Sequence, residues 1–241
     1  MEYIDANKVK EAFNSFGPQK AAGPDGLRPA TFQCHSDILY QTISHLYKKS
    51  IEFGYTPQVW REMKVCFIPK QGKTSYDRAK SYRPITLSNF ILKGLERLVQ
   101  WYVNEKVVRE PLYAQHAYTT GLSCDTALST VVDHIERSVL RKEYVLAVSL
   151  DCSGAFDSIR FGSAKKAMKL MKLPEGVIQW YNNLLRSRKV TAELQGEKIT
   201  RLPTRGSPQG GVLSPLIWNM IMHTLLSSFQ VGPSKSSGLC R

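Results

Sequence analysis

The chain has 241 residues, of which 42% are hydrophobic, a length and composition that can bury a sizeable core. It contains no apolar run of about 18 residues, which argues against a transmembrane span. The net charge of +13 favours a polyanionic partner, nucleic acid above all, over a basic surface that serves only solubility.

The first sixty residues predict helices separated by turns. Asp5 can cap a helix over residues 5–16, whose apolar side chains fall on one face. Residues 21–26, rich in glycine and proline, predict a turn. Apolar spacing then predicts one long helix over residues 29–53, and the Thr56-Pro57 pair predicts the start of another helical turn.

Two extended segments with a basic loop between them come next. Residues 63–69 alternate and are rich in strand-forming side chains, so they predict a strand. Residues 71–80 predict an exposed loop, and residues 83–87 are extended because the residue before a proline avoids the helical region. Ser88 is a candidate cap for a helix over residues 89–109.

The second half predicts one interior strand among helices. Residues 144–150 form a continuous apolar run of strand length, which is typical of a strand covered on both faces. The other expected elements are helices over 123–141, 163–172, 174–187 and 214–229, a hairpin over 190–202, and a disordered tail over 232–241.

Asp151 and Gln209 are the first candidate functional residues. Asp151 follows the apolar run, and a carboxylate at a sheet end is costly unless it meets a cation or a hydrogen-bond donor. It is therefore a candidate Mg²⁺ ligand, with a cap on the turn that follows as the alternative. Gln209 precedes the pair Gly210-Gly211, where glycines allow close approach of a ligand; the alternative is an ordinary turn into a helix.

Five motifs in one order give a family resemblance. From Asp5 to about Phe229 the chain resembles the reverse transcriptase of non-LTR (LINE-like) retrotransposons. The resemblance implies an α+β right-hand polymerase, mostly helical with a small antiparallel sheet, in which residues 1–112 form a fingers-like lobe and 113–231 a partial palm. The motifs are Gly23-Pro24-Asp25-Gly26, Phe67-Ile68-Pro69-Lys70, Ser81-Tyr82-Arg83-Pro84-Ile85-Thr86-Leu87, Leu150-Asp151 with Gly154-Ala155-Phe156-Asp157, and Gly206-Ser207-Pro208-Gln209-Gly210 with Ser214-Pro215.

The resemblance also implies residue roles. Asp151 would be the first catalytic aspartate and would bind Mg²⁺ together with the backbone carbonyl of Cys152, in a site that holds two ions in the intact family. Phe156 would select a deoxyribose, although plain core packing is its alternative. The remaining roles are contacts to the triphosphate (Lys70 and Arg83), contacts to the nucleotide or nascent base pair (Gln209 and Gly210), and structural support (Asp157 as a cap, Gly23 and Gly26 in a turn).

The sequence departs from the family after Asp157. No aspartate follows that residue, whereas active members carry a Tyr/Phe-Ala-Asp-Asp segment on a later strand. Asp151 alone cannot hold two hard cations, so we expect the chain to be a truncated form without polymerase activity of its own. The strand over 144–150 would lose its neighbour, which predicts an exposed edge prone to aggregation.

The expected function is RNA-directed DNA synthesis, in which dNTPs are added to a primer 3′-OH on an RNA template. The partners would be the RNA template, the DNA primer and dNTP, without a membrane. Scattered cysteines without a Cys-x-x-Cys pair indicate a reducing intracellular location, and the resemblance implies the nucleus. A residual RNA- or DNA-binding module without catalysis, a product without any role, and a group II intron maturase or telomerase-like enzyme stay open.

Overall fold

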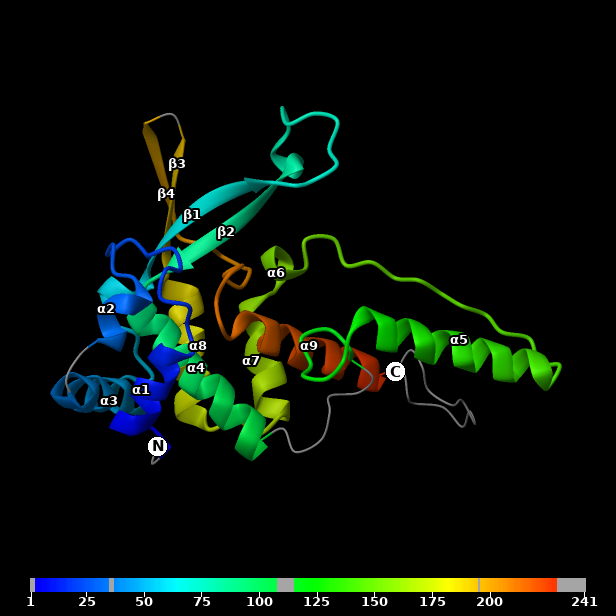
Figure 1. Ribbon diagram of the computed structural model, residues 1–241, viewed down its shortest axis with the longest axis horizontal. Helices are drawn as coiled ribbons and strands as arrows, with labels where there is room; N and C mark the ends of the chain where they lie inside the picture. The colour runs from blue at the N-terminus through cyan, green and yellow to red at the C-terminus, as the bar shows by residue number, and fades with distance from the viewer. Residues whose placement is uncertain (1–2, 35–36, 108–114, 195, 229–241) are drawn as a thin grey trace.

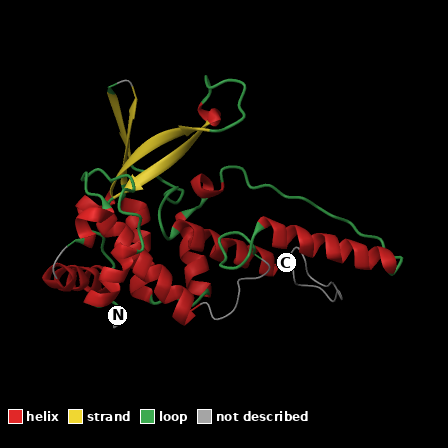
Figure 2. Ribbon diagram, in the orientation of Figure 1, coloured by secondary structure: helices red, strands yellow, loops and turns green. Residues whose placement is uncertain are grey.

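A computed structural model describes residues 3–34, 37–107, 115–194 and 196–228 (Figure 1). Helices make up the body of the molecule, and the strands project from one side of it (Figure 2). The elements are α1 (Ala6–Asn14), α2 (Pro29–Gln33), α3 (Asp37–Glu52), η1 (Gln58–Arg61), β1 (Glu62–Pro69), η2 (Ala79–Ser81), β2 (Tyr82–Ser88), α4 (Phe90–Tyr102), η3 (Val103–Val107), α5 (Cys124–Leu140), α6 (Ala155–Ser158), α7 (Phe161–Leu170), α8 (Glu175–Ser187), β3 (Lys189–Leu194), β4 (Glu197–Arg201) and α9 (Ser214–Ser228).

The four strands form one mixed sheet in the order β2-β1-β3-β4. The pairs β1–β2 and β3–β4 are antiparallel, as expected, but β1 and β3 run parallel, with Glu62 opposite Lys189. The prediction of a small, mostly helical α+β fold is confirmed, and the prediction of a purely antiparallel sheet is wrong. The parallel pair arises because η1 and α8 deliver β1 and β3 from the helical body in the same direction (Figure 1).

Aromatic side chains fill the core of the helical body. Phe13 of α1 stacks on Phe32 of α2 with ring centroids 4.7 Å apart, and Trp180 of α8 is fully buried. The buried Tyr47 of α3 donates its hydroxyl proton to the carbonyl oxygen of Ile91 in α4 at 2.5 Å. The core therefore joins helices from both ends of the chain, which is the reason that the sheet can be assembled from distant segments.

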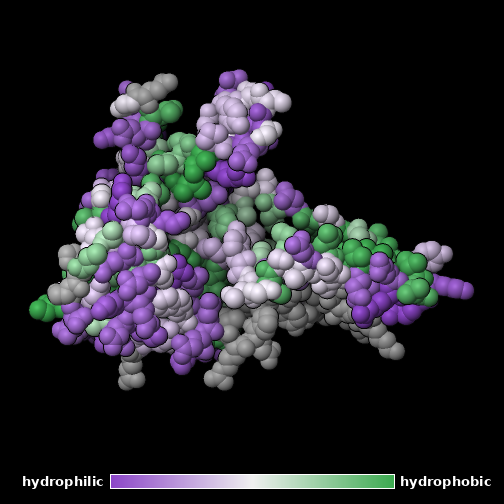
Figure 3. Space-filling model, viewed as in Figure 1, coloured by the Kyte–Doolittle hydropathy of each residue, from purple (hydrophilic) through white to green (hydrophobic). Residues whose placement is uncertain are grey.

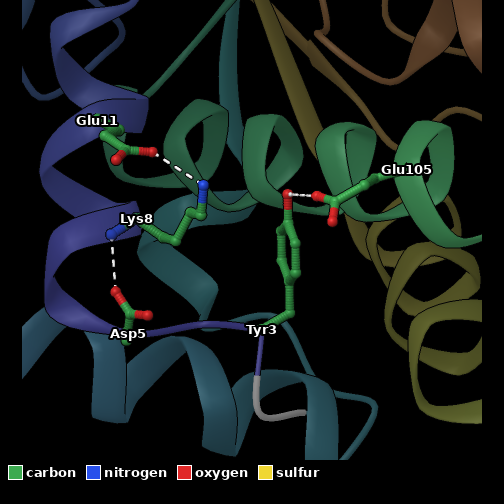
Figure 4. A network of polar contacts seen from close by, with 5 residues as sticks. All are labelled: Tyr3, Asp5, Lys8, Glu11 and Glu105. Carbon is green, nitrogen blue, oxygen red and sulfur yellow. Dashed lines mark hydrogen bonds and ion pairs between the residues drawn. The ribbon is translucent and has the colours of Figure 1, made fainter.

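Local capping signals at the N-terminus are confirmed. The Asp5 carboxylate accepts the Lys8 amide hydrogen at 2.8 Å, as expected for the cap of α1. The Tyr3 hydroxyl donates to Glu105 at 3.0 Å, and Lys8 pairs with Glu11 at 3.1 Å (Figure 4). Burial, together with the Glu105 carboxylate, raises the pKa of Tyr3 to about 12, so this bond ties the N-terminal segment to η3 over the whole physiological range.

The predicted long helix over residues 29–53 is interrupted. α2 ends at Gln33, and Cys34 leaves helical geometry with φ −105° and ψ 24° before α3 begins at Asp37. The Gln33 side-chain amide donates to the carbonyl of Phe13, and the Tyr40 hydroxyl donates to that of Phe32. The Tyr40 bond satisfies a carbonyl in the last turn of α2, and the Gln33 bond ties that turn to α1, so tertiary contacts end α2 earlier than apolar spacing alone predicts.

Helix starts elsewhere follow the sequence closely, with small shifts. Ser123 caps α5 with a reciprocal bond to Thr126, as a capping box requires. Ser88 is not the cap of α4, because it is the last residue of β2 and Asn89 occupies the cap position. The helix predicted over residues 89–109 is α4 followed by the π-helical η3, and the 112/113 boundary and the predicted tail lie outside the described residues.

The apolar run over residues 144–150 is not a strand. It forms an extended exposed segment that returns from the far end of α5 to α6 (Figure 1), and Leu146 and Leu150 are 88% and 82% exposed. A strand requires a neighbour for its backbone groups, and within the described ranges no strand lies beside this run. Figure 3 shows hydrophobic side chains gathered over α5 and this segment. The exposed apolar residues of α5 include Leu128, Val139 and Leu140.

The described helices include none with the length and apolar character needed to cross a bilayer.

Candidate functional site

The loop that contains Gln209 is bound to the free edge of the sheet. This Gln209 loop spans residues 205–213 between β4 and α9. The Thr86 amide of the edge strand β2 donates to the Gln209 carbonyl at 2.7 Å. Gly210 has φ +115°, and a Cβ there would lie 2.7 Å from the Thr86 carbonyl oxygen. The glycine therefore does permit a close backbone approach, but the backbone it meets belongs to β2.

The start of the Gln209 loop is bound to the motif around Phe156. The Ser207 amide donates to the Phe156 carbonyl at 2.8 Å, and the Gly206 amide donates to the Ile159 carbonyl at 2.7 Å. Gly206 has φ +88°, and a Cβ there would lie 3.1 Å from the Asp157 carbonyl oxygen. Backbone bonds thus join two motifs that are about fifty residues apart in the sequence.

Three hydroxyl groups connect the loop to α8 and α9. The buried Ser207 Oγ donates to Ser214 Oγ at 2.7 Å, and Ser214 Oγ donates to the Pro208 carbonyl at 2.8 Å. Because the single Ser207 hydroxyl proton is used in this way, Tyr181 is the donor in its 2.9 Å bond to Ser207. Burial raises the pKa of Tyr181 to about 12, which keeps this phenol protonated and able to donate.

Arg188 holds the first residues of the loop from within the core. Its side chain is 4% exposed, and its guanidinium donates to the carbonyls of Leu185, Arg205 and Gly206 at 2.5, 3.1 and 2.9 Å. Burial lowers the pKa of Arg188 to about 10, so the group remains charged at neutral pH. The carbonyl dipoles of the loop therefore compensate part of the cost of burying this cation.

Glu96 holds the second half of the loop. This α4 residue is 1% exposed, and its Oε2 accepts the Val212 amide hydrogen at 3.0 Å. Burial raises the pKa of Glu96 to about 7, against the opposing effects of the Val212 bond and of the nearby Lys93 and Arg97. Sequence reasoning missed Glu96 and Arg188. The signal for Glu96 was a carboxylate within the apolar stripe of a helix; Arg188 has no comparable signal.

Phe156 takes part in an aromatic cluster. It is partly buried in α6, and its ring centroid lies 6.2 Å from that of Tyr118 and 6.1 Å from that of Trp218. Trp218 belongs to α9, the helix that the Gln209 loop enters. These contacts give Phe156 a packing role at the site.

Lys70 and Arg83 project from one face of the β1–β2 ribbon. Arg83 is exposed and lies opposite Ile68, while the Lys70 amide donates to the Ser81 carbonyl at 2.8 Å. Because successive side chains alternate, this register puts Lys70 and Arg83 on the same face. The Lys70 ammonium donates to the Lys80 carbonyl at 2.9 Å. The two predicted triphosphate contacts are therefore neighbours at the far end of the ribbon.

Asp151 and Cys152 lie in the exposed segment before α6, so Asp151 does not end a strand as expected. Asp157 is exposed within α6, and α7, whose N-cap is Arg160, has no side-chain cap from it. Among the described residues no three His, Cys, Asp or Glu side chains are grouped in a way that could hold a metal ion. The carboxylates within the described ranges therefore do not fit a complete two-ion Mg²⁺ site.

The Gly23–Gly26 turn packs against the end of β2. The Gly26 amide donates to the Gly23 carbonyl at 3.1 Å, and Gly26 has φ +72°, which favours glycine. A Cβ on Gly23 would lie 2.7 Å from the Asn89 backbone nitrogen, so this position has no room for a side chain. The turn thus lies against the junction of β2 with α4.

Comparison with known proteins gives one family. The family of reverse transcriptases (RNA-dependent DNA polymerases) matches residues 68–237. The Pol polyprotein of retrotransposable element R1 from Bradysia coprophila is 26% identical over 224 residues, 92% of this chain and 22% of that protein. The probable RNA-directed DNA polymerase from transposon BS of Drosophila melanogaster is 28% identical over 222 residues, 90% of this chain and 24% of that protein.

A third relative, the Pol polyprotein of retrotransposable element R2 from Popillia japonica, is 29% identical over 187 residues. That match covers 75% of this chain and 25% of the relative. The chain therefore spans a quarter or less of the length of these curated relatives.

Proposed function

This chain belongs to the reverse transcriptase (RNA-dependent DNA polymerase) family, and we propose that it forms the nucleotide- and template-holding part of a non-LTR retrotransposon polymerase. In such an enzyme dNTPs are added to a primer 3′-OH as an RNA template is copied. In this proposal residues 1–112 form the fingers-like lobe and residues 113–231 the partial palm, as the sequence predicts.

The observation that carries the proposal is the backbone network of the Gln209 loop. One side of the loop is bonded to β2 at Thr86, and the Ser207 amide on the other side is bonded to the Phe156 carbonyl of α6. Arg83 lies three residues before Thr86 on the same strand. This network supports a site in which Gln209 contacts the nucleotide while the Arg83 guanidinium binds its phosphates, an interaction for which the planar guanidinium is suited.

A divalent ion would supply charge neutralisation for phosphoryl transfer, with Asp151 and the Cys152 carbonyl as the proposed ligands. These groups do not complete an ion site by themselves, since Asp151 is exposed and the described part of the chain holds no group of three His, Cys, Asp or Glu side chains that could bind a metal ion. We therefore expect this 241-residue chain alone to bind primer–template and dNTP but not to extend the primer. Asp151-dependent primer extension with Mg²⁺ would contradict this expectation.

The test measures dNTP binding to the chain with a fluorescent RNA template–DNA primer and Mg²⁺. Arg83→Gln should weaken dNTP affinity about tenfold, because one charge-assisted phosphate contact is lost. Arg78→Gln is the matched control, since Arg78 is also an exposed arginine of the β1–β2 hairpin and should leave dNTP affinity unchanged. Equal effects of the two substitutions would refute a nucleotide site at Arg83.

The second candidate function is a nucleic-acid-binding module without a nucleotide site. The net charge of +13 favours it, because lysines and arginines release counterions when they bind phosphates. Under this alternative RNA binding would fall steeply with salt, while dNTP would change nothing and Arg83→Gln would behave like Arg78→Gln. The same titrations therefore distinguish the two functions.

A further inference from the structure

Glu96 is aimed at the Gln209 loop from inside the protein. Both carboxylate oxygens lie against the second half of the loop: Oε2 accepts the Val212 amide hydrogen, and Oε1 lies 3.4 Å from the position that a Cβ on Gly211 would take. The residue is 1% exposed. An acidic side chain this deeply buried is costly, and the hydrogen bond that its carboxylate accepts among the described residues comes from this loop.

The contacts of the loop divide between its two halves. Arg188 and the carbonyls of Phe156 and Ile159 hold residues 205–207, and the Thr86 amide holds Gln209. In the described structure, residues 210–212 have one hydrogen bond to a partner outside the loop and α9. It is the bond from the Val212 amide to Glu96. Removal of this acceptor would leave a part-buried amide without a partner and free the segment that follows Gln209.

We propose that Glu96 is a positioning residue for Gln209: by accepting the Val212 amide hydrogen it fixes the second half of the loop on α4, and so fixes Gln209 on β2 for nucleotide contact. The last step rests on the function proposed above. The contact by which Glu96 holds the loop does not depend on that function. Loop positioning and nucleotide binding can therefore be measured separately.

The charged surroundings of Glu96 make its effect depend on pH. The charges of Lys93 and Arg97 on its own helix act on it, Glu96 and Tyr181 of α8 influence each other, and Arg188 acts on Tyr181 in turn. Opening of the loop would expose the carboxylate to water, where its pKa returns from about 7 towards 4.5. The closed loop therefore holds the proton more tightly than the open loop, so opening becomes more favourable as pH rises from 4.5 to about 7 and then levels off.

The first experiment is hydrogen–deuterium exchange of peptides that cover residues 208–214, corrected for intrinsic exchange. Glu96→Leu removes the acceptor and should speed loop exchange at least about fivefold, while peptides from α1 are unchanged. Glu96→Gln keeps an oxygen acceptor and should remove the pH dependence, which in the unsubstituted chain should reach roughly tenfold or more between pH 5.5 and 8. Glu136→Gln, an exposed carboxylate of α5, is the control and should change neither.

Unchanged loop exchange in Glu96→Leu, or an equal rise in every peptide, would overturn the proposal. If Glu96→Leu fails to fold, the pH profile of Glu96→Gln decides, because a pH dependence that survives this substitution belongs to another group. The second experiment is dNTP affinity with Mg²⁺ and primer–template, which Glu96→Leu should lower about tenfold with RNA affinity unchanged.

The two experiments separate the two proposals. Loop exchange that depends on Glu96 in a chain that binds no dNTP would refute the proposed function and leave Glu96 as the anchor of the loop. Intact dNTP binding with loop exchange independent of Glu96 would refute the positioning role of Glu96 and leave the function.

Discussion

At the scale of single residues, the buried guanidinium of Arg188, the residue that follows α8, donates to three carbonyl oxygens. Arg188→Met should lower the free energy of unfolding by about 2–4 kcal/mol, because buried carbonyls of the Gln209 loop lose their donor. Urea unfolding followed by circular dichroism measures this change. The control is Arg186, an exposed arginine in the last turn of α8. Arg186→Met should cost less than about 0.5 kcal/mol, and an equal loss in both variants would contradict the role of Arg188.

Gly210 and Gly72 separate backbone strain from steric contact. Both have positive φ, but a Cβ on Gly210 would lie 2.7 Å from the Thr86 oxygen, whereas a Cβ on Gly72 would meet nothing within 4 Å. Gly72→Ala should therefore cost about 1 kcal/mol and Gly210→Ala more than about 2 kcal/mol in unfolding free energy. Thermal and urea unfolding of the two variants test this difference. Similar losses would mean that the loop does not depend on its close contact with β2.

At the scale of elements, the edge strand β2 has a hydrogen-bonding neighbour, whereas the apolar segment over residues 144–150 has no strand beside it in the described structure. This neighbour at the free edge of β2 is the Gln209 loop, which is bonded to Thr86. Val148→Lys should slow aggregation without changing the free energy of unfolding by more than about 0.5 kcal/mol, because Val148 is 64% exposed. Light scattering on heating measures this. Ser163→Lys adds the same charge on α7, and an equal delay there would show that net charge, not the segment, controls aggregation.

At the scale of the whole molecule, the net charge of +13 should make folding sensitive to salt. Raising KCl from about 50 to 300 mM screens the self-repulsion and should raise the thermal midpoint by about 2–4 °C, equivalent to about 1 kcal/mol. The double variant Lys73→Glu and Lys166→Glu lowers the net charge to +9, since each reversal removes two charges from +13, and should reduce the salt effect. A salt response that is unchanged in this variant would assign the effect to specific ion binding.

The sequence by itself determined the features that depend on near neighbours. Asp5 and Ser123 cap their helices because a capping bond spans three residues, and the β3–β4 hairpin needs only its own turn and alternation. The ordered motifs around Asp151 and Gln209 also indicated the polymerase family, and the family match over residues 68–237 confirms it.

Only the tertiary structure decided which distant segments of the chain are neighbours. The bond between Glu96 and Val212 spans 116 residues, and the parallel pairing of β1 with β3 spans a similar separation, so no local pattern specifies either. The apolar run over residues 144–150 has strand composition but stays unpaired, because a strand is stable only when a neighbour satisfies its backbone groups. Short stretches of the chain thus determine the motif residues and the local conformation, whereas the site depends on contacts between residues that are far apart in the sequence and meet only in the folded structure.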